Sequence, residues 1–313
     1  MSAHSKSWDV VVAGDLFIDI VMSGFSSFPR PGQEAFAQQL RREIGGGAAI
    51  TSSALARLNL KVAALGSAGL DDTPWLVDRL TAAGVDTSAL KQHPTEPTGM
   101  TVSVSTPQDR AFYTYYGANE CLPRLLKDRP ALDLMAAARH VHFAFAPDPA
   151  LGAGLFAELH QHGCRVSIDV GWHESWLRDH RSLDLLRQAD LFLPNEQEAQ
   201  AITGEREPQA MLDAFARRGL RNVALKLGAS GAMLAFEGKR YRCPAYPVTP
   251  LDTTGAGDCF NAGFLYAWLG GERPECCLQI AAICGALSTR ALGGVAAFPN
   301  RQELEHAMET VQS

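Results

Sequence analysis

The sequence contains 313 residues, of which 46% are hydrophobic and 20% are charged, as in ordinary globular proteins. Glycine and proline together stay well below the ~25–30% typical of low-complexity chains, so the composition excludes collagen-like and disordered proteins. The formal net charge of −6 lacks the basic excess of proteins that bind nucleic acids or anionic membranes. An anionic ligand must therefore be held by local features of the chain.

The sequence shows neither a membrane span nor a secretion signal. No apolar run approaches the ~18–20 residues that cross a membrane, and Asp15 and Asp19 follow the first apolar run too closely for a signal peptide. The seven cysteines form no Cys-x-x-Cys pair, and an odd number in a long chain favours reduced thiols. We therefore expect a cytoplasmic protein that has no membrane or nucleic-acid partner.

Short apolar runs, typical of buried strands, alternate along the chain with helical patterns. The strands are expected at residues 10–13, 62–65, 141–146, 166–170, 191–194 and 223–227. The helices are expected at residues 48–58, 75–83, 152–162, 183–189, 196–203, 211–218, 257–269, 274–289 and 301–311. This alternation predicts an α/β fold with a mainly parallel sheet that is covered by helices on both faces.

Two segments interrupt this alternation. Residues 16–43 hold a strand-like start followed by prolines, and residues 98–117 hold two β-branched and aromatic runs that join around residues 107–109. Together they predict a small β lid inserted into a discontinuous main domain of residues 1–15, 44–97 and 118–313. Because bare strand edges seek partners, the lid also favours a homodimer formed through its strands.

The most informative segment is residues 252–258, with the sequence Asp-Thr-Thr-Gly-Ala-Gly-Asp. Gly255 and Gly257 permit a tight turn, and the helical period that follows places this turn at a helix N-terminus. Free main-chain amides and the helix dipole at that point favour a phosphate group. Asp258 then lies in the first helical turn, where it either accepts a proton from an incoming hydroxyl or merely stabilises the helix end.

This segment resembles the C-terminal signature of the ribokinase-like (phosphofructokinase B type, PfkB) carbohydrate kinases. The resemblance implies a three-layer α/β/α sandwich with a β lid, and ATP-dependent phosphorylation of a hydroxymethyl group on a small sugar or sugar derivative. It also implies that Asp258 is the catalytic base and that an anion hole is formed by Gly255, Ala256 and Gly257.

The resemblance extends to the expected acceptor site. Asp19 matches an acid that contacts sugar hydroxyls, a task suited to a carboxylate because it accepts several donors. Asn119 is a further substrate-site residue by resemblance, and a turn residue is the alternative. Ile50 stands where family members commonly have a sugar-contacting Asn, so either the acceptor lacks a hydroxyl there or Thr51 substitutes. The glycines expected to let the main chain approach the acceptor are Gly45, Gly46 and Gly47.

Residues 194–199 resemble the Asn-x-x-Glu motif that follows a strand in this family. The resemblance implies that Asn195 lies at the bound ATP and that Glu198 holds Mg²⁺ through water, which suits an ion that keeps much of its hydration shell. The alternative is a plain helix cap, in which Asn195 binds the first helical amides and Glu198 completes the first turn.

The remaining expected ligands of ATP and cations also follow from the resemblance. Lys226 is expected to meet the ATP phosphates, with a surface lysine at a strand end as the alternative. Gly228 and Gly231 would allow the main chain to approach the nucleotide closely. Thr254 adds a further ATP contact, and Asp252 is the candidate ligand of K⁺, which family members often bind near the signature.

Other readings of the sequence are weaker. Gly152, Gly154 and Ala157 fit a dinucleotide-binding pattern, but five residues separate the first glycine from the preceding strand, which disfavours a dehydrogenase. A nucleoside kinase of the same family is the main alternative, because Ile50 and the aromatic run at residues 112–116 would accept a flat base. A non-catalytic regulatory member of the family is disfavoured by the intact signature.

Overall fold

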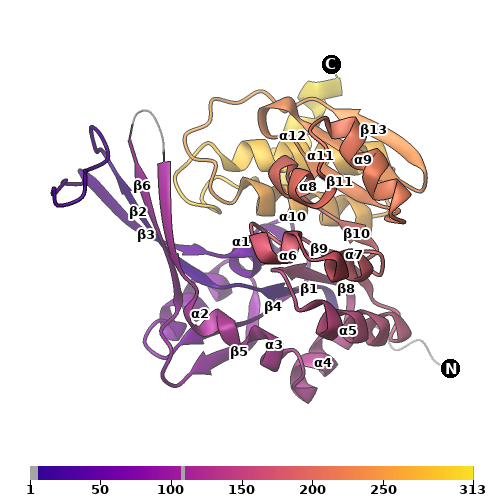
Figure 1. The fold of residues 1–313 in the computed structure, drawn as a ribbon, viewed down its shortest axis with the longest axis horizontal. Coiled ribbons are helices and arrows are strands. Elements are labelled where there is room, and N and C mark those ends of the chain that lie inside the picture. The colour runs from indigo at the N-terminus through magenta and orange to yellow at the C-terminus, as the bar shows by residue number, and fades with distance from the viewer. Residues whose placement is uncertain (1–5, 107–109, 313) are drawn as a thin grey trace.

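The computed structural model describes residues 6–106 and 110–312, in which a large sheet and a smaller one are visible (Figure 1). The large sheet has the strand order β13-β12-β11-β10-β9-β8-β1-β4-β5. Neighbouring strands from β11 to β5 pair in parallel, whereas β12 and β13 are added in antiparallel fashion. The strands are β1 (Trp8–Gly14), β4 (Val62–Gly69), β5 (Asp86–His93), β8 (Ala138–Ala144), β9 (Arg165–Ile168), β10 (Leu191–Phe192), β11 (Val223–Lys226), β12 (Ala232–Phe236) and β13 (Lys239–Cys243).

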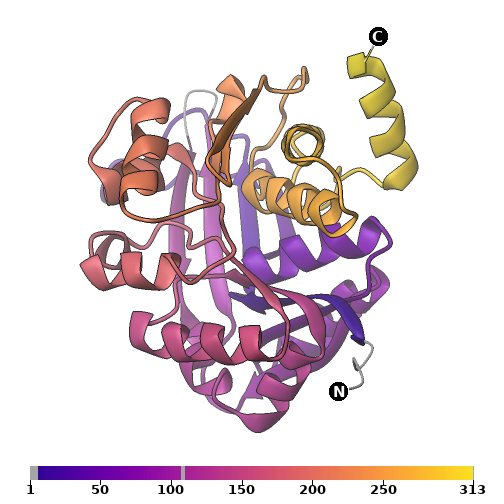
Figure 2. The ribbon, with the colours of Figure 1, turned by 90° about the vertical axis from the view of Figure 1, so that its right-hand side faces the viewer.

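Helices cover both faces of this sheet, which confirms the predicted three-layer α/β/α arrangement (Figure 2). Alternate residues of β1 belong to two separate cores: Val10 and Val12 pack with α1, α10 and α11, and Val11 and Ala13 pack on the other face. The helices are α1 (Gly47–Arg57), α2 (Thr73–Ala82), α3 (Leu122–Leu125), α4 (Arg129–Ala136), α5 (Pro149–Gln161), α6 (Glu174–Leu177), α7 (His180–Leu186), α8 (Glu196–Thr203), α9 (Pro208–Arg217), α10 (Ala256–Leu269), α11 (Pro274–Ser288) and α12 (Arg301–Gln312).

The smaller sheet, called the lid sheet below, has the order β3-β2-β6-β7 and projects from the main body (Figure 1). Its strands are β2 (Phe17–Ser23), β3 (Gln39–Gly45), β6 (Gly99–Ser105) and β7 (Arg110–Tyr115). The β2–β3 and β6–β7 pairs are antiparallel, and β2 pairs with β6 in parallel. The predicted connection at residues 107–109 lies outside the described residues, and the domain boundaries remain a prediction.

The sequence analysis missed both outer parts of the large sheet. The residues of β5 are half-exposed or exposed, and those of β13 are mostly so, which leaves no continuous apolar run to recognise. The missed hairpin β12–β13 matters most, because the chain after it forms one wall of a cavity described below. Within the described residues, no helix has both the length and the apolar character of a membrane span.

Asn119 joins the lid sheet to the main body. The residue is fully buried in the turn Gly117–Cys121, and its Nδ2 donates to the main-chain oxygens of Leu16 at 2.9 Å and Tyr116 at 3.0 Å. Its Oδ1 accepts from the amide of Leu16 at 2.9 Å. Both protons of the Asn119 side-chain amide are therefore donated to main-chain oxygens, one just before β2 begins and one just after β7 ends. This geometry favours a role in positioning the lid over the direct acceptor contact expected from the sequence.

Candidate active site

The parallel topology gathers the polar residues that follow strand ends. The carboxyl ends of parallel strands meet at one edge of a sheet, and ligands of open α/β sheets bind outside that edge. Asp15 follows β1, Asp169 follows β9, Asn195 follows β10 and Lys226 ends β11. The fold thereby brings side chains from widely separated positions, between Asp15 and Lys226, to the same edge of the sheet.

The predicted turn at a helix N-terminus is present. Gly255 adopts a left-handed φ of 71° and immediately precedes α10, whose first amides have no acceptor within the helix. A Cβ atom on Gly255 would lie 2.8 Å from Cα of Gly294 and 3.0 Å from Cδ1 of Ile50, so glycine is required for space as well as for conformation. Ile50 thus packs against the turn that carries the signature.

Asp258 lies in the first turn of α10 and points toward α1. Thr51 on α1 donates a hydrogen bond from Oγ1 to Oδ1 of Asp258 at 3.5 Å, and a Cβ atom on Gly47 would lie 3.2 Å from the same oxygen. Burial and, to a smaller extent, the charge of Asp169 raise the pKa of Asp258 to about 7, against the opposing effects of Lys226 and Thr51. The carboxyl group is therefore set to exchange a proton near neutral pH.

Asp19 places a second carboxylate beside the glycines of the β3–α1 connection. A Cβ atom on Gly45 would overlap the Asp19 carboxylate, and one on Gly46, which has a φ of 87°, would overlap the main-chain oxygen of Asp15. Burial raises the pKa of Asp19 to about 6, with further contributions from the charges of Asp252 and Glu43. Glycine is thus needed at position 45 to seat the carboxylate of Asp19 and at position 46 to clear the main chain of Asp15.

A buried ion pair that the sequence analysis missed holds Lys226. Its Nζ lies 2.5 Å from Oδ2 of Asp169, and Asn261 donates from Nδ2 to the same oxygen at 2.5 Å. Burial works to raise the pKa of Asp169, but the ammonium and both hydrogen bonds outweigh burial and lower it. A Cβ atom on Gly257 would lie 3.4 Å from Nζ, so the ammonium sits next to the Gly-Ala-Gly turn.

Asn195 and Glu198 form a complete capping box at the start of α8. Oδ1 of Asn195 accepts from the Glu198 amide at 2.9 Å, and Oε2 of Glu198 accepts from the Asn195 amide at 2.9 Å. Glu198 is 2% exposed, and burial raises its pKa to about 7. Because Asn195 also pairs with Lys226 in an isolated parallel bridge, the cap lies beside the buried ion pair.

A cavity of about 520 Å³ opens next to the Gly-Ala-Gly turn. It reaches from Lys226 and Gly257 to a loop at residues 245–250 and to the face of α11, so one end is polar and the other is largely apolar. Gly228 and Gly231 line it, as expected, but the loop after β13 was not expected. The cavity is also lined by Ala256, Phe260, Ala282, Gly285 and Thr289.

Asp252 fixes the signature turn to the loop after α11. Its Oδ1 accepts from the amide and hydroxyl of Thr254 at 2.9 and 2.8 Å, and its Oδ2 accepts from the Gly293 amide at 3.0 Å. The amides of Leu251 and Asp252 in turn donate to the main-chain oxygen of Thr289 at 2.7 and 3.0 Å. Thr254 therefore bonds to Asp252, and Thr253 rather than Thr254 lines the cavity.

Comparison with known proteins decides the family. A sequence model described as pfkB family carbohydrate kinase matches residues 8–302. The chain belongs to the pfkB family of carbohydrate kinases. It is 28% identical to ribokinase from Haemophilus influenzae, over 95% of this kinase and 99% of the relative, and 31% identical to ATP-dependent ribose-1-phosphate kinase from Halopiger xanaduensis, over 92% and 90%.

Solved structures agree with this assignment. The structure of Arabidopsis thaliana ribokinase complexed with ribose and ATP is 25% identical, and it superposes with a TM-score of 0.86 over 96% of this kinase and 99% of that chain. The kinase therefore has the ribokinase fold and is an ATP-dependent sugar kinase. The resemblance that the signature suggested is confirmed over nearly the whole chain.

The raised pKa of Asp258 predicts the pH dependence of this kinase. A base must be ionised to accept a proton, so kcat/KM for the acceptor should fall about tenfold per pH unit below pH about 7. The Thr51 hydroxyl stabilises the ionised form of Asp258, so Thr51→Val should move this limb to higher pH. The measurement is kcat/KM against pH at saturating ATP.

Thr51→Ser, which keeps the hydroxyl, is the matched control. A terminal phosphate also titrates near pH ~6, but it does so equally with every variant, and the difference between valine and serine reports Asp258. Identical profiles for the two variants would remove Asp258 as the origin of the limb.

Proposed function

We propose that this kinase transfers the terminal phosphoryl group of ATP to a hydroxymethyl group of a small sugar or sugar derivative. The observation that carries the proposal is the placement of the Asp258 carboxylate in the first turn of α10, directly after the left-handed Gly255. The first turn of α10 would thereby supply main-chain amides that bind the phosphoryl oxygens and a carboxylate that accepts the proton of the acceptor hydroxyl.

In the proposed mechanism, ATP lies in the 520 Å³ cavity with its phosphates toward Lys226 and Gly257. The acceptor lies on the Asp19 side of the turn, and its hydroxyl oxygen attacks the terminal phosphorus while Asp258 takes the hydroxyl proton. The bond from that phosphorus to the bridging oxygen breaks, and its electron pair leaves with ADP. Amides at the turn and the nearby ammonium stabilise the developing charge, so catalysis is mainly positioning and electrostatics.

The residues around the ion pair fit a magnesium ion held through water. Asp169, Glu198 and Asp258 interact electrostatically around the single ammonium of Lys226, which leaves an excess of negative charge. Among the described residues, no three His, Cys, Asp or Glu side chains converge to hold a metal directly. We propose that Glu198 binds the hydration shell of Mg²⁺, which neutralises phosphate charge when bound.

Potassium is a further proposed activator. The Asp252 carboxylate holds the loop at residues 289–294 against the signature, where main-chain oxygens are the donors that such an ion would use. Asp252 and Thr254 would then shape the site. Replacing K⁺ by Na⁺ in the kinase assay tests this part of the proposal separately from phosphoryl transfer.

The acceptor class is tested by measuring ADP formation with matched panels of sugars and nucleosides. We expect turnover with a small sugar, and Asp258→Asn should lower kcat by about 10²–10⁴ while ATP still binds, because the amide cannot take a proton. ATP affinity of this variant, measured by calorimetry, is the control for folding. Turnover with nucleosides alone would select the nucleoside-kinase alternative, and near-normal kcat of Asp258→Asn would contradict the base assignment.

Asp19 is proposed to bind the acceptor rather than ATP. Asp19→Asn keeps the volume beside Gly45 but removes the charge that accepts hydroxyl donors, so KM for the acceptor should rise at least about tenfold with KM for ATP unchanged. Glu43→Gln is the matched control, since Glu43 faces Asp19 across β2–β3 but pairs with Arg79 at 2.9 Å. Equal losses for both substrates would exclude Asp19 from the acceptor site.

We propose a homodimer formed through the lid sheet, supported by its register. Asp19 lies on one face of the sheet. The next residue, Ile20, lies on the other face, together with its cross-strand partner Val102 on β6 and with Tyr113, which pairs with Val102, on β7. That outer face also carries Leu40, which is 66% exposed, and Tyr113 is 66% exposed as well.

Light scattering should therefore give twice the mass of one chain, and Leu40→Lys combined with Tyr113→Lys should give one chain's mass. Thr114→Lys, on the Asp19 face of the same strand, is the control and should leave the dimer intact. A monomeric unaltered protein would refute this arrangement.

We also propose a cytoplasmic site of action, where ATP is supplied and the seven thiols, all free in the structure, stay reduced.

A further inference from the structure

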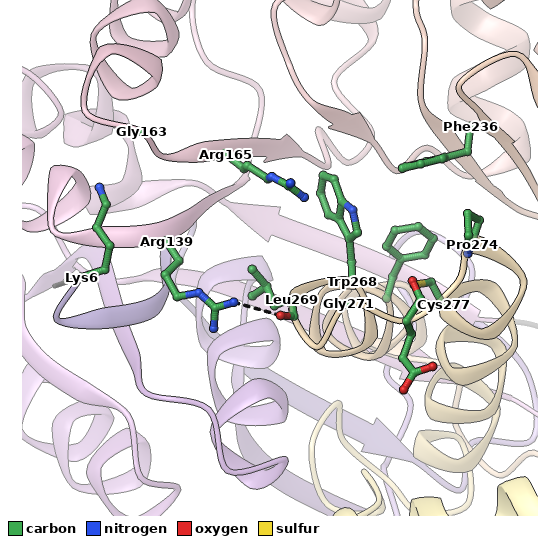
Figure 3. A pocket seen from close by; sticks show the side chains of 12 residues that line it. Lys6, Arg139, Gly163, Arg165, Phe236, Trp268, Leu269, Gly271, Pro274 and Cys277 are labelled. Atoms are coloured by element: carbon green, nitrogen blue, oxygen red, sulfur yellow. Dashed lines mark hydrogen bonds between the residues drawn. The ribbon is translucent and has the colours of Figure 1, made fainter. Parts of the chain in front are cut away.

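A second cavity, of about 530 Å³, lies far from the chemistry just described. Arg139 and Arg165 line it from the starts of β8 and β9, so it opens at the amino ends of the parallel strands (Figure 3). The proposed catalytic and ATP-binding residues follow the carboxyl ends of strands, at the opposite edge of the sheet. None of those residues lines the second cavity, so phosphoryl transfer does not account for it.

Three aromatic side chains form one part of the wall of the second cavity. Trp268, from the last turn of α10, is half-buried, and its ring lies 6.3 Å from the rings of both Phe236 and Phe264 at steep angles. Pro274 and Leu269 extend this apolar lining (Figure 3). Rings that are locked by such edge contacts present fixed flat surfaces, which suit the flat apolar body of a ligand.

The charges around the second cavity are predominantly positive. The Arg165 guanidinium lies 5.1 Å over the Trp268 ring, and within residues 6–106 and 110–312 it has no hydrogen-bond or carboxylate partner. Lys6 donates to uncharged acceptors: the main-chain oxygens of Ala136 and His162, each at 2.7 Å, and Sγ of Cys164 at 3.3 Å.

One of the three cations is already neutralised. Arg139 is paired with Asp9 at 2.9 Å and donates to the main-chain oxygen of Leu269 at 2.9 Å. Glu272 is the one carboxylate among the described lining residues. Among the described lining residues, Lys6 and Arg165 thus have no carboxylate partner, and Glu272 is the only acid opposite them. The cavity is therefore locally positive, although the net charge of the chain is −6. A local positive surplus of this kind attracts an anion.

We propose that the second cavity is a ligand site for a small aromatic anion, whose ring packs on Trp268 and Phe236 and whose phosphate or carboxylate pairs with Arg165. The aromatic walls select the ring, and the unpaired guanidinium selects the anionic group, since arginine binds both groups through paired N–H donors. The site is additional to the proposed function and holds whether or not the acceptor is a sugar.

Phenyl phosphate is the probe for the second cavity, with a non-hydrolysable ATP analogue saturating the catalytic cavity of the intact protein. Calorimetry should give saturable binding at one site. Arg165→Gln should weaken binding at least about tenfold, because a charge-assisted pair is lost, and Trp268→Leu should weaken it as well. Arg206→Gln, at another exposed arginine, is the matched control and should bind as the unaltered protein does.

Further probes separate the two parts of the proposal. Inorganic phosphate, which lacks the ring, and benzyl alcohol, which lacks the charge, should each bind at least about tenfold more weakly than phenyl phosphate. Equal affinity for either would overturn the corresponding part. No saturable binding, or equal effects of Arg165→Gln and Arg206→Gln, would overturn the whole. Kinase activity of Arg165→Gln should be unchanged, which verifies that the variant is folded.

Discussion

The buried ion pair between Lys226 and Asp169 is the interaction on which the catalytic edge of the sheet depends. The pair joins the end of β11 to the segment after β9, and Asn261 on α10 binds the same carboxylate oxygen. The helix that carries Asp258 is therefore tied to two strands by one charged cluster. Removing the ammonium would leave the Asp169 carboxylate buried without its counter-ion, which costs about 3–5 kcal/mol in proteins.

The same ammonium also controls how the nearby carboxyl groups ionise. Burial raises the pKa of Glu198 and Asp258, and the charge of Asp169 adds to both shifts, whereas Lys226 opposes both. Its distance from the Gly-Ala-Gly turn also lets it attract an anion that enters there. One lysine thus stabilises the folded edge, opposes the rise in the pKa of Asp258 and lies beside the proposed anion-binding turn.

Local physics explains which parts of the fold and site were predictable from the sequence. Strands buried on both faces are continuous apolar runs, so the strands from β11 to β4 were found, whereas the polar edge strands β5 and β13 carry no such pattern. The interior strand β12 does carry an apolar run and was nevertheless missed. The Gly-Ala-Gly turn and Asp258 are contiguous, so their conformation follows from neighbouring residues. The contact between Asp169 and Asn261 spans 92 residues and exists only after the sheet has formed.

The side-chain alternation of β2 connects the proposed acceptor site with the outer surface of the lid. Asp19 lies on one face of this strand and Ile20 on the other, because successive side chains of a strand point to opposite faces. A one-residue change of register would exchange the two faces. Asn119 fixes the main chain at Leu16, directly before β2, and thereby holds the strand in place. The same anchor therefore sets the direction of the Asp19 carboxylate and the exposure of the apolar outer face.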